Sequence, residues 1–419
     1  MVMGETVAAI VEAHRAGASI EATVARCYAR IRAHDDPAIF ISLRAEADAI
    51  AEAKMLAAEA DADGSLAERP LYGVPVAIKD NIDVAGLPTT AACPAFAYTP
   101  AKDATCVARL KRAGAIVIGK TNLDQFATGL VGVRTPYGIA RNLFDPALIP
   151  GGSSSGSAIA VAAGLVPLAL GTDTAGSGRV PAALSNIVGL KPSLGLVSTA
   201  GVVPACRTLD CVSVLALTVD DAFAALARLA RLGAAIVAFD IEPFYEAARL
   251  LYEGPWIAER YITARSLIAS APQAMHPVTR QIILAGAHPT AADVFAAFYR
   301  LEELRRVSEH TFRSIDAMAL PTVPTVYTVE QVLADPIGLN SRLGTYTNFV
   351  NLLDLAALAV PASMRPDGTP FGITLVAPAE TDAALASIGR AFHADTGLPL
   401  GATSAPQPPL APSQAKVSA

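Results

Sequence analysis

The sequence contains two glycine- and serine-rich loops and one lysine that could together support nucleophilic catalysis. The first loop is residues 150–157 (PGGSSSGS) and the second is residues 171–179 (GTDTAGSGR). Upstream, Lys79 ends the apolar segment 73–79 (GVPVAIK). A serine hydroxyl is a poor nucleophile at neutral pH and needs a base. A lysine can be that base where burial keeps its amine neutral, since desolvation disfavours the charged form.

Other interpretations of these segments are weaker. A glycine-serine run is usually a flexible linker, but apolar residues flank both loops. Neither loop has the GxxxxGK[ST] pattern of a phosphate-binding loop, and the second lacks GxGxxG spacing. Taken alone, Lys79 would be a surface lysine in most proteins. None of the six histidines lies near the loops in sequence, although folding could bring one close.

Taken together, the three segments resemble the amidase signature family, whose hydrolases use a Ser–Ser–Lys triad. The resemblance implies that Lys79 is the base, Ser153 the relay and Ser177 the nucleophile. Ser177 follows Ser153 by 24 residues, which matches the family's spacing. The family also holds the relay serine in a cis peptide bond. Nearly the whole sequence, from about residue 5 to 400, shares the resemblance.

The turn before Ser177 offers consecutive backbone N–H groups. We expect those of Thr174, Ala175 and Gly176 to form the oxyanion hole. In the implied reaction, Lys79 accepts a proton from Ser153 while Ser153 accepts one from Ser177, which attacks an amide carbonyl. This chemistry requires no metal and no cofactor.

Two further segments indicate the substrate. Residues 125–134 and 203–212 resemble allophanate hydrolases most closely within the family. The resemblance implies hydrolysis of the terminal amide of allophanate, a small urea-derived anion, with release of ammonia in urea degradation. The carboxylate of such a substrate calls for an arginine that can bind it in bidentate fashion.

Four residues are candidates for binding this small anionic amide. Tyr299 and Arg306 are seven residues apart, hence on one face of a predicted helix. Arg179 lies close to the nucleophile, and Gly129 lies in one of the two allophanate-hydrolase-like segments. Each has a structural alternative: Arg306 as a solvated helix charge, Tyr299 as a residue at the edge of the core, and Arg179 as the partner of an acid beneath the loop.

Three other functions stay open at this point. The first is another hydrolase of the same family, acting on biuret-like, malonamate or aryl amides. The second is an amidotransferase subunit that releases ammonia from glutamine for a tRNA-modifying complex. The third is a catalytically silent binding or assembly subunit, against which the intact Lys79, Ser153 and Ser177 argue.

The elements that position these residues follow from apolar spacing. Short apolar strands alternate with helices, which favours an α/β layered fold with a largely buried sheet. The family resemblance implies the amidase-signature fold, a large mixed central β-sheet flanked by helices in α/β/α layers. In the first half of the chain, the predicted helices are 5–16, 20–33, 45–60 and 107–113, and the predicted strands are 71–78, 115–118 and 165–170.

The second half of the chain is predicted to be mainly helical. Further helices are expected at 218–232, through most of 240–315 on the substrate side, and at 383–394, with strands at 318–323 and 371–376. We expect residues 1–400 to form the amidase domain. The proline-rich residues 401–419 are predicted to be a linker or disordered tail, so the C-terminal domain of longer allophanate hydrolases is expected to be absent.

The amino-acid composition argues against several other classes of protein. Of 419 residues, 53% are hydrophobic and 17% charged, and the net charge is −6, with no basic block that would suit nucleic acid. The longest apolar run, 158–170, is shorter than the roughly 20 residues that span a membrane. Five cysteines without a CxxC pair argue against disulfides and zinc and favour the cytoplasm. The family resemblance suggests a homodimer.

Overall fold

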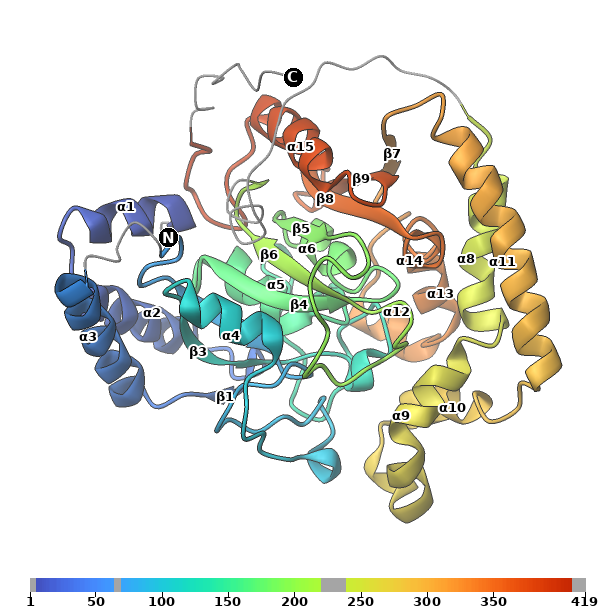
Figure 1. The fold of residues 1–419 in the computed structure, drawn as a ribbon, viewed down its shortest axis with the longest axis horizontal. Coiled ribbons are helices and arrows are strands. Elements are labelled where there is room, and N and C mark those ends of the chain that lie inside the picture. Colours follow the sequence, from blue (N-terminus) through green and yellow to red (C-terminus); the bar gives the residue numbers. More distant parts are fainter. Residues whose placement is uncertain (1–4, 64–68, 220–238, 409–419) are drawn as a thin grey trace.

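The computed structural model describes residues 5–63, 69–219 and 239–408 (Figure 1). Within them, nine strands form one sheet in the order β1-β3-β2-β4-β6-β5-β8-β9-β7. The pairs β2–β3 and β2–β4 are parallel and the others antiparallel, so the predicted mixed sheet is confirmed. The strands are β1 (Phe40–Leu43), β2 (Pro75–Lys79), β3 (Ile116–Thr121), β4 (Leu168–Asp173), β5 (Val188–Lys191), β6 (Cys211–Ala216), β7 (Met318–Pro321), β8 (Leu355–Met364) and β9 (Pro370–Pro378).

Side chains of the central strands alternate between two separate hydrophobic clusters, one on each face of the sheet. On β2, Val76 and Ile78 belong to the first cluster, and Ala77 to the second. On β4, Leu168 belongs to the first and Ala169 to the second. This period of two is what a strand imposes, and it means that both faces of the sheet are covered.

Helices on the two faces complete the α/β/α layers (Figure 1). The first cluster includes residues of α1, α4 and α15, and the second includes residues of α2, α3, α5 and α6. The bounds are α1 (Val7–Arg15), α2 (Ile20–His34), α3 (Glu46–Asp63), α4 (Thr105–Arg112), α5 (Ser155–Ala162), α6 (Arg179–Leu184) and α15 (Asp382–Thr396). The predicted N-cap of α2, Ser19, accepts a hydrogen bond from the Ala22 N–H.

The predicted helical region at 240–315 contains four helices, α8 (Glu242–Glu253), α9 (Ile257–Ser270), α10 (Pro277–Ala285) and α11 (Ala291–Thr311). They lie along one side of the sheet, in yellow and orange (Figure 1). The cluster around Phe244, Trp256 and Leu301 joins α8 and α11 to the sheet. Three shorter helices follow in the chain: α12 (Val329–Ala334), α13 (Gly338–Leu343) and α14 (Phe349–Leu352). Short 3-10 turns lie earlier in the chain: η2 (Pro94–Phe96), η3 (Gln125–Ala127) and η4 (Pro272–Ala274).

The end of the described chain differs from the sequence prediction of a tail beginning at residue 401. Residues 401–408 pack against the domain, because Leu400 and Ala405 are buried in the same cluster as α5. The side-chain amide of Asn186 also donates hydrogen bonds to the carbonyls of Pro399 and Gly401. The rest of the predicted tail and most of the predicted helix 218–232 lie outside the described residues. None of the described helices is both long and apolar enough for a membrane span.

Candidate active site

Lys79 lies at the end of β2, where the sequence predicted it, and its side chain is fully buried. Its Nζ atom donates hydrogen bonds to Ser153 Oγ and Thr172 Oγ1, each 2.8 Å away. Thr172 lies near the end of β4, which runs parallel to β2. Because the carboxyl ends of parallel strands meet at one edge of a sheet, Lys79, the predicted base, is positioned by strands rather than by a loop.

Burial lowers the pKa of Lys79 to about 7, because desolvation penalises the ammonium form. The carboxylates of Asp124, Asp173 and Asp210 act in the opposite direction, since negative charge favours the ammonium. At neutral pH, a pKa of about 7 leaves a large share of the amine neutral. A general base needs that form.

Ser153 follows a cis peptide bond from Gly152, as the family resemblance implied. A Cβ atom on Gly152 would lie 2.2 Å from Asp124 Oδ2, so only glycine fits this position. Asp124 also accepts hydrogen bonds from the backbone N–H groups of Val131 and Gly132. The first serine loop is therefore packed directly on the segment that contains Gly129.

Ser177 lies in the loop between β4 and α6 and is 2% exposed. Its hydroxyl donates a hydrogen bond to the Gly129 carbonyl at 3.4 Å, and its own carbonyl accepts the Ser154 N–H at 3.1 Å. The two serine loops are thus in direct contact, and Gly129 is beside the nucleophile. Among the described residues, no hydrogen bond joins the hydroxyls of Ser177 and Ser153 in this conformation.

One of the three predicted oxyanion donors is already engaged. The Gly176 N–H donates to Asp173 Oδ1 at 2.8 Å, which turns it toward the interior of the loop. Of the predicted set, this leaves the N–H groups of Thr174 and Ala175 as the available donors. The sequence places Asp173 in the same loop, but only the fold of the turn shows which N–H group it accepts from.

Arg179 pairs with an acid beneath the loop, which was the structural alternative to binding substrate. Its Nε and Nη2 atoms donate to the two carboxylate oxygens of Asp173, each at 2.9 Å, and both side chains are fully buried. Burial by itself would raise the pKa of Asp173, but the Arg179 charge outweighs this effect and the pKa falls to about 2. The Nε and Nη2 atoms are therefore committed to an ion pair beneath the loop that contains Ser177.

A second carboxylate joins the nucleophile loop to residues 203–210. Asp210 accepts the Thr174 hydroxyl at 2.6 Å and the backbone N–H groups of Ala205 and Cys206 at 2.9 and 3.1 Å. Both loops are therefore held to the same buried group. The segment resembling allophanate hydrolases forms a wall of the site.

The structure brings a different arginine to the site. Arg260 of α9 is buried, and its Nη1 atom donates to Thr128 Oγ1 at 3.0 Å and to the Ala127 carbonyl at 3.3 Å. Its guanidinium also lies 5.7 Å from the ring centre of Tyr252. Thr128 precedes Gly129, the residue that accepts the nucleophile's hydrogen bond. Within the described part of the chain, Nε and Nη2 make no hydrogen bond, so this edge can still meet a carboxylate.

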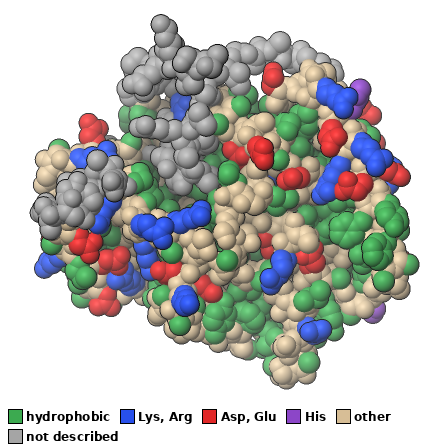
Figure 2. Space-filling model, in the orientation of Figure 1, with side chains coloured by type: hydrophobic (Ala, Val, Ile, Leu, Met, Phe, Trp, Pro, Cys, Tyr) green, Lys and Arg blue, Asp and Glu red, His purple; other side chains and the backbone are tan. Residues whose placement is uncertain are grey.

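Tyr299 and Arg306 are not brought to the triad. Both lie on α11, which packs on α8; Tyr299 is 69% exposed and Arg306 is exposed too. The ring contact of Tyr299 is with Phe295, also on α11. Figure 2 shows hydrophobic side chains gathered where α11 lies. No hydrogen bond joins this pair to the triad in the part of the chain that the structure describes, so its role in binding the substrate stays a prediction.

Several residues that shape the site were missed by sequence reasoning. Arg260 contacts residues more than 130 positions earlier, and Asp210 contacts Thr174 across 36 positions. No local pattern signals such contacts. Asp173, by contrast, stands inside the second loop and could have been recognised as its internal acceptor. The described residues contain no group of three or more His, Cys, Asp or Glu side chains placed to hold a metal ion.

Similarity to known proteins covers most of the chain. The sequence is 46% identical over 415 residues to the urea amidolyase of Lachancea kluyveri, which covers 86% of this chain and 22% of that protein. It is 33% identical over 444 residues to a glutamyl-tRNA(Gln) amidotransferase subunit from Symbiobacterium thermophilum, which covers 85% and 90%. The chain thus spans about a fifth of the urea amidolyase and nearly all of the amidotransferase subunit.

Solved structures and a family model agree with these relatives. The fold superposes on Kluyveromyces lactis allophanate hydrolase with a TM-score of 0.87 at 38% identity, covering 96% of this chain and 75% of that one. The family model described as Amidase matches residues 22–230 and 222–386. Because this match extends over more than half of the sequence, the chain belongs to the amidase family, the family of enzymes with the amidase signature.

Proposed function

We propose that this chain is a serine amidohydrolase that cleaves the terminal amide of allophanate and releases ammonia in urea degradation. The observation that carries the proposal is the 2.8 Å hydrogen bond between Lys79 Nζ and Ser153 Oγ in a fully buried setting beside Ser177. Similarity to a urea amidolyase and to an allophanate hydrolase supports the choice of substrate.

The proposed reaction begins with the neutral amine of Lys79. The Ser177 hydroxyl turns from the Gly129 carbonyl toward Ser153, and its proton passes to Ser153 as the Ser153 proton passes to Lys79. Ser177 Oγ then bonds to the amide carbon, and the carbonyl oxygen gains the negative charge. The N–H groups of Thr174 and Ala175 are available to stabilise this oxyanion.

Collapse of the tetrahedral intermediate completes the reaction. The proton held by Lys79 returns through Ser153 to the leaving nitrogen, the carbon–nitrogen bond breaks and ammonia departs. Water then attacks the acyl group on Ser177 and restores the free hydroxyl. No residue of the triad gains or loses a net proton over the cycle.

We assign recognition of the substrate carboxylate to Arg260. Its unengaged Nε and Nη2 atoms form the planar edge that binds a carboxylate through two parallel hydrogen bonds. In support of this assignment, the guanidinium donates to Thr128, and the next residue, Gly129, accepts the hydrogen bond of the Ser177 hydroxyl. Arg260 thus replaces Arg306 and Arg179 as the proposed carboxylate-binding group.

The test is ammonia release by the purified chain from allophanate, biuret, malonamate and glutamine, compared by kcat/KM. The proposal predicts a strong preference for allophanate. Turnover of biuret or malonamate without turnover of allophanate would keep the serine chemistry and remove the substrate assignment. Ammonia from glutamine alone would favour the second candidate, an amidotransferase subunit, for which the Symbiobacterium relative provides the supporting similarity.

Two further parts of the proposal concern the cell and the assembly. We propose a homodimer, following the family resemblance, and a cytoplasmic location, which the five buried free cysteines support. Size-exclusion chromatography with light scattering measures the first. A monomer at micromolar concentration would remove the dimer from the proposal and leave the chemistry unchanged.

A further inference from the structure

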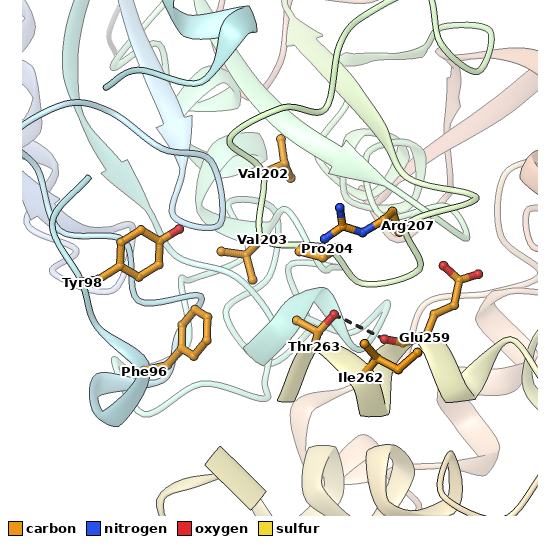
Figure 3. Close-up of a pocket in the computed structure, with 9 residues that line it drawn as sticks. All are labelled: Phe96, Tyr98, Val202, Val203, Pro204, Arg207, Glu259, Ile262 and Thr263. Carbon is orange, nitrogen blue, oxygen red and sulfur yellow. Dashed lines mark hydrogen bonds between the residues drawn. The ribbon is translucent and has the colours of Figure 1, made fainter. Parts of the chain in front are cut away.

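A cavity of about 510 Å³ opens beside the loop 203–210 (Figure 3). Phe96 and Tyr98 form one wall, and Val203 and Pro204 lie across from them. Residues of α9 close the lower side: Glu259, Ile262 and Thr263. The walls therefore come from three segments that are far apart in the sequence.

One wall of the cavity is linked to Lys79, the proposed base, through a chain of hydrogen bonds. The Val203 N–H donates to the Asn81 carbonyl at 2.8 Å, and the Asn81 side-chain amide donates to Thr172 Oγ1 at 3.3 Å. Thr172 Oγ1 in turn accepts the hydrogen bond from Lys79. Two residues thus connect the cavity wall at Val203 to the base.

The cavity walls at Glu259 and Phe96 lie beside the residues that surround Arg260. Glu259 is the chain neighbour of Arg260, the proposed carboxylate-binding group. Phe96 packs edge-on against Phe126 with ring centres 5.1 Å apart, and Phe126 precedes the Ala127 carbonyl that Arg260 contacts. The cavity therefore lies against the elements that hold the base and against those that hold the buried arginine.

Arg207 gives the rim of the cavity a free positive charge. Its side chain is exposed and has no ion-pair partner among the described residues, and its guanidinium extends toward Pro204 (Figure 3). The carboxylate of Glu259, also on the rim, is engaged by Thr208 through the backbone N–H at 2.9 Å and through the hydroxyl. Arg207 is thus the unengaged charge at this opening.

We propose that this cavity is the route by which the small anionic amide reaches Ser177, and that Arg207 attracts the anion at its mouth. The proposal rests on the proposed function for the identity of the substrate. Lys79, Ser153 and Ser177 are at most 2% exposed, so a substrate must cross the surrounding walls to reach them. An exposed cation at the entrance raises the local concentration of an anion, and a second, buried cation at Arg260 receives it.

Thiol labelling tests the route. All five native cysteines are buried, so Ile262→Cys, at a position that is 64% exposed, introduces a single accessible thiol on the cavity wall. A bulky pyrene maleimide there is expected to lower kcat/KM for allophanate by about tenfold or more, because it obstructs the approach of substrate, and a methylthio group by less than about twofold. Ala269→Cys, exposed on the same helix about 10 Å farther along, is the matched control and is expected to be unaffected.

The result that overturns the route is kcat/KM within twofold of the unlabelled enzyme when Ile262→Cys carries the bulky label. Failure of the proposed function has a different signature, because the unlabelled chain would then release no ammonia from allophanate. In that case, the rate at which a sulfonyl fluoride inactivates the chain through Ser177 measures access instead. The same dependence on label size is expected.

A charge variant tests Arg207. Arg207→Gln is expected to lower kcat/KM for allophanate about three- to fivefold at low salt, and the difference should vanish near 1 M salt, where the screening length is about 3 Å. Arg313→Gln, also exposed and without an ion-pair partner in the described structure, is the control outside the cavity. An equal loss for a neutral amide, or a loss that persists at high salt, would overturn the role of Arg207.

Discussion

At the scale of single residues, the proposed function depends on a proton that Lys79 accepts and on a substrate carboxylate that Arg260 binds. Lys79 has to be neutral in order to accept a proton, and its burial at the end of β2 achieves this by lowering its pKa to about 7. Arg260 has to be charged in order to bind a carboxylate, and a guanidinium keeps its proton even when it is buried. The same interior therefore supports a neutral lysine and a charged arginine, because the two groups differ so much in intrinsic basicity.

The pH dependence of turnover follows from Lys79. Because its active form is the neutral amine, kcat/KM should rise with pH through about 7 and then level off. Lys79→Ala should lower kcat by about 10²–10⁴-fold and abolish this rise. Rates measured from pH 5.5 to 9 check both statements, and a flat wild-type profile across neutral pH would remove Lys79 as the base.

If Arg260 binds the substrate carboxylate, its replacement should raise KM more for a charged substrate than for a neutral one. Arg260→Gln should raise KM for allophanate by about 10- to 100-fold, as expected for the loss of charge-assisted hydrogen bonds worth about 1.5–3 kcal/mol. The effect on a neutral amide should be far smaller. Arg306→Gln is the matched variant: the exposed position on α11 predicts no change, whereas the sequence-based prediction requires a rise in KM.

Melting temperatures of both variants separate a binding defect from unfolding, because Arg260 is buried and Arg306 is not. A rise in KM of the same size for charged and neutral amides would assign Arg260 a structural role.

At the scale of elements, the nucleophile loop is held by groups beneath it. Asp173 accepts hydrogen bonds from the backbone N–H groups of Gly176 and Gly178 and pairs with Arg179, so one carboxylate shapes the turn on which Ser177 stands. Asp210 holds the neighbouring loop to the same turn through Thr174. The turn is therefore preorganised, as an oxyanion hole requires.

Breaking the buried ion pair should cost stability. Arg179→Met leaves the Asp173 carboxylate buried without its partner and should lower the free energy of unfolding by about 3–5 kcal/mol. Urea denaturation measures the change. Arg249→Met removes an ion pair with Glu242 whose side chains are 50% and 66% exposed, and it should cost less than about 1 kcal/mol. Equal losses for the two variants would contradict the account of the loop.

At the scale of the whole molecule, the sequence predicted the layers of the fold and five of the nine strands in the described sheet. β2, β3, β4, β7 and β9 were predicted from short apolar runs, and the mixed sheet and the amidase family are confirmed. β8 was missed: its first residues (LAALAV) are buried on both faces and rich in alanine, so they show no alternation. The triad followed from the family resemblance, whereas Arg260 followed only from tertiary contacts.

Acid should weaken the whole fold through His393. Burial lowers the pKa of this side chain to about 4, below its ordinary value of 6.5. Between these two pH values the unfolded chain binds a proton that the folded chain does not, so stability should fall by about 3 kcal/mol as the pH drops from 6.5 to 4. Denaturation curves against pH check this, and His393→Gln should lose that part of the dependence. If His393→Gln loses stability with acid as the wild type does, groups other than His393 cause the acid sensitivity.

The most direct test of the central claim is ammonia release from allophanate by the wild-type chain and by Ser177→Ala. The account predicts rapid release by the wild type and loss of essentially all turnover in the variant, with the melting temperature preserved. Ser155→Ala, in the other serine loop, is the control: among the described residues its hydroxyl donates to the Asn122 carbonyl alone, so turnover should stay largely intact. Retained activity in a folded Ser177→Ala chain would contradict the assignment of the nucleophile and, with it, the account as a whole.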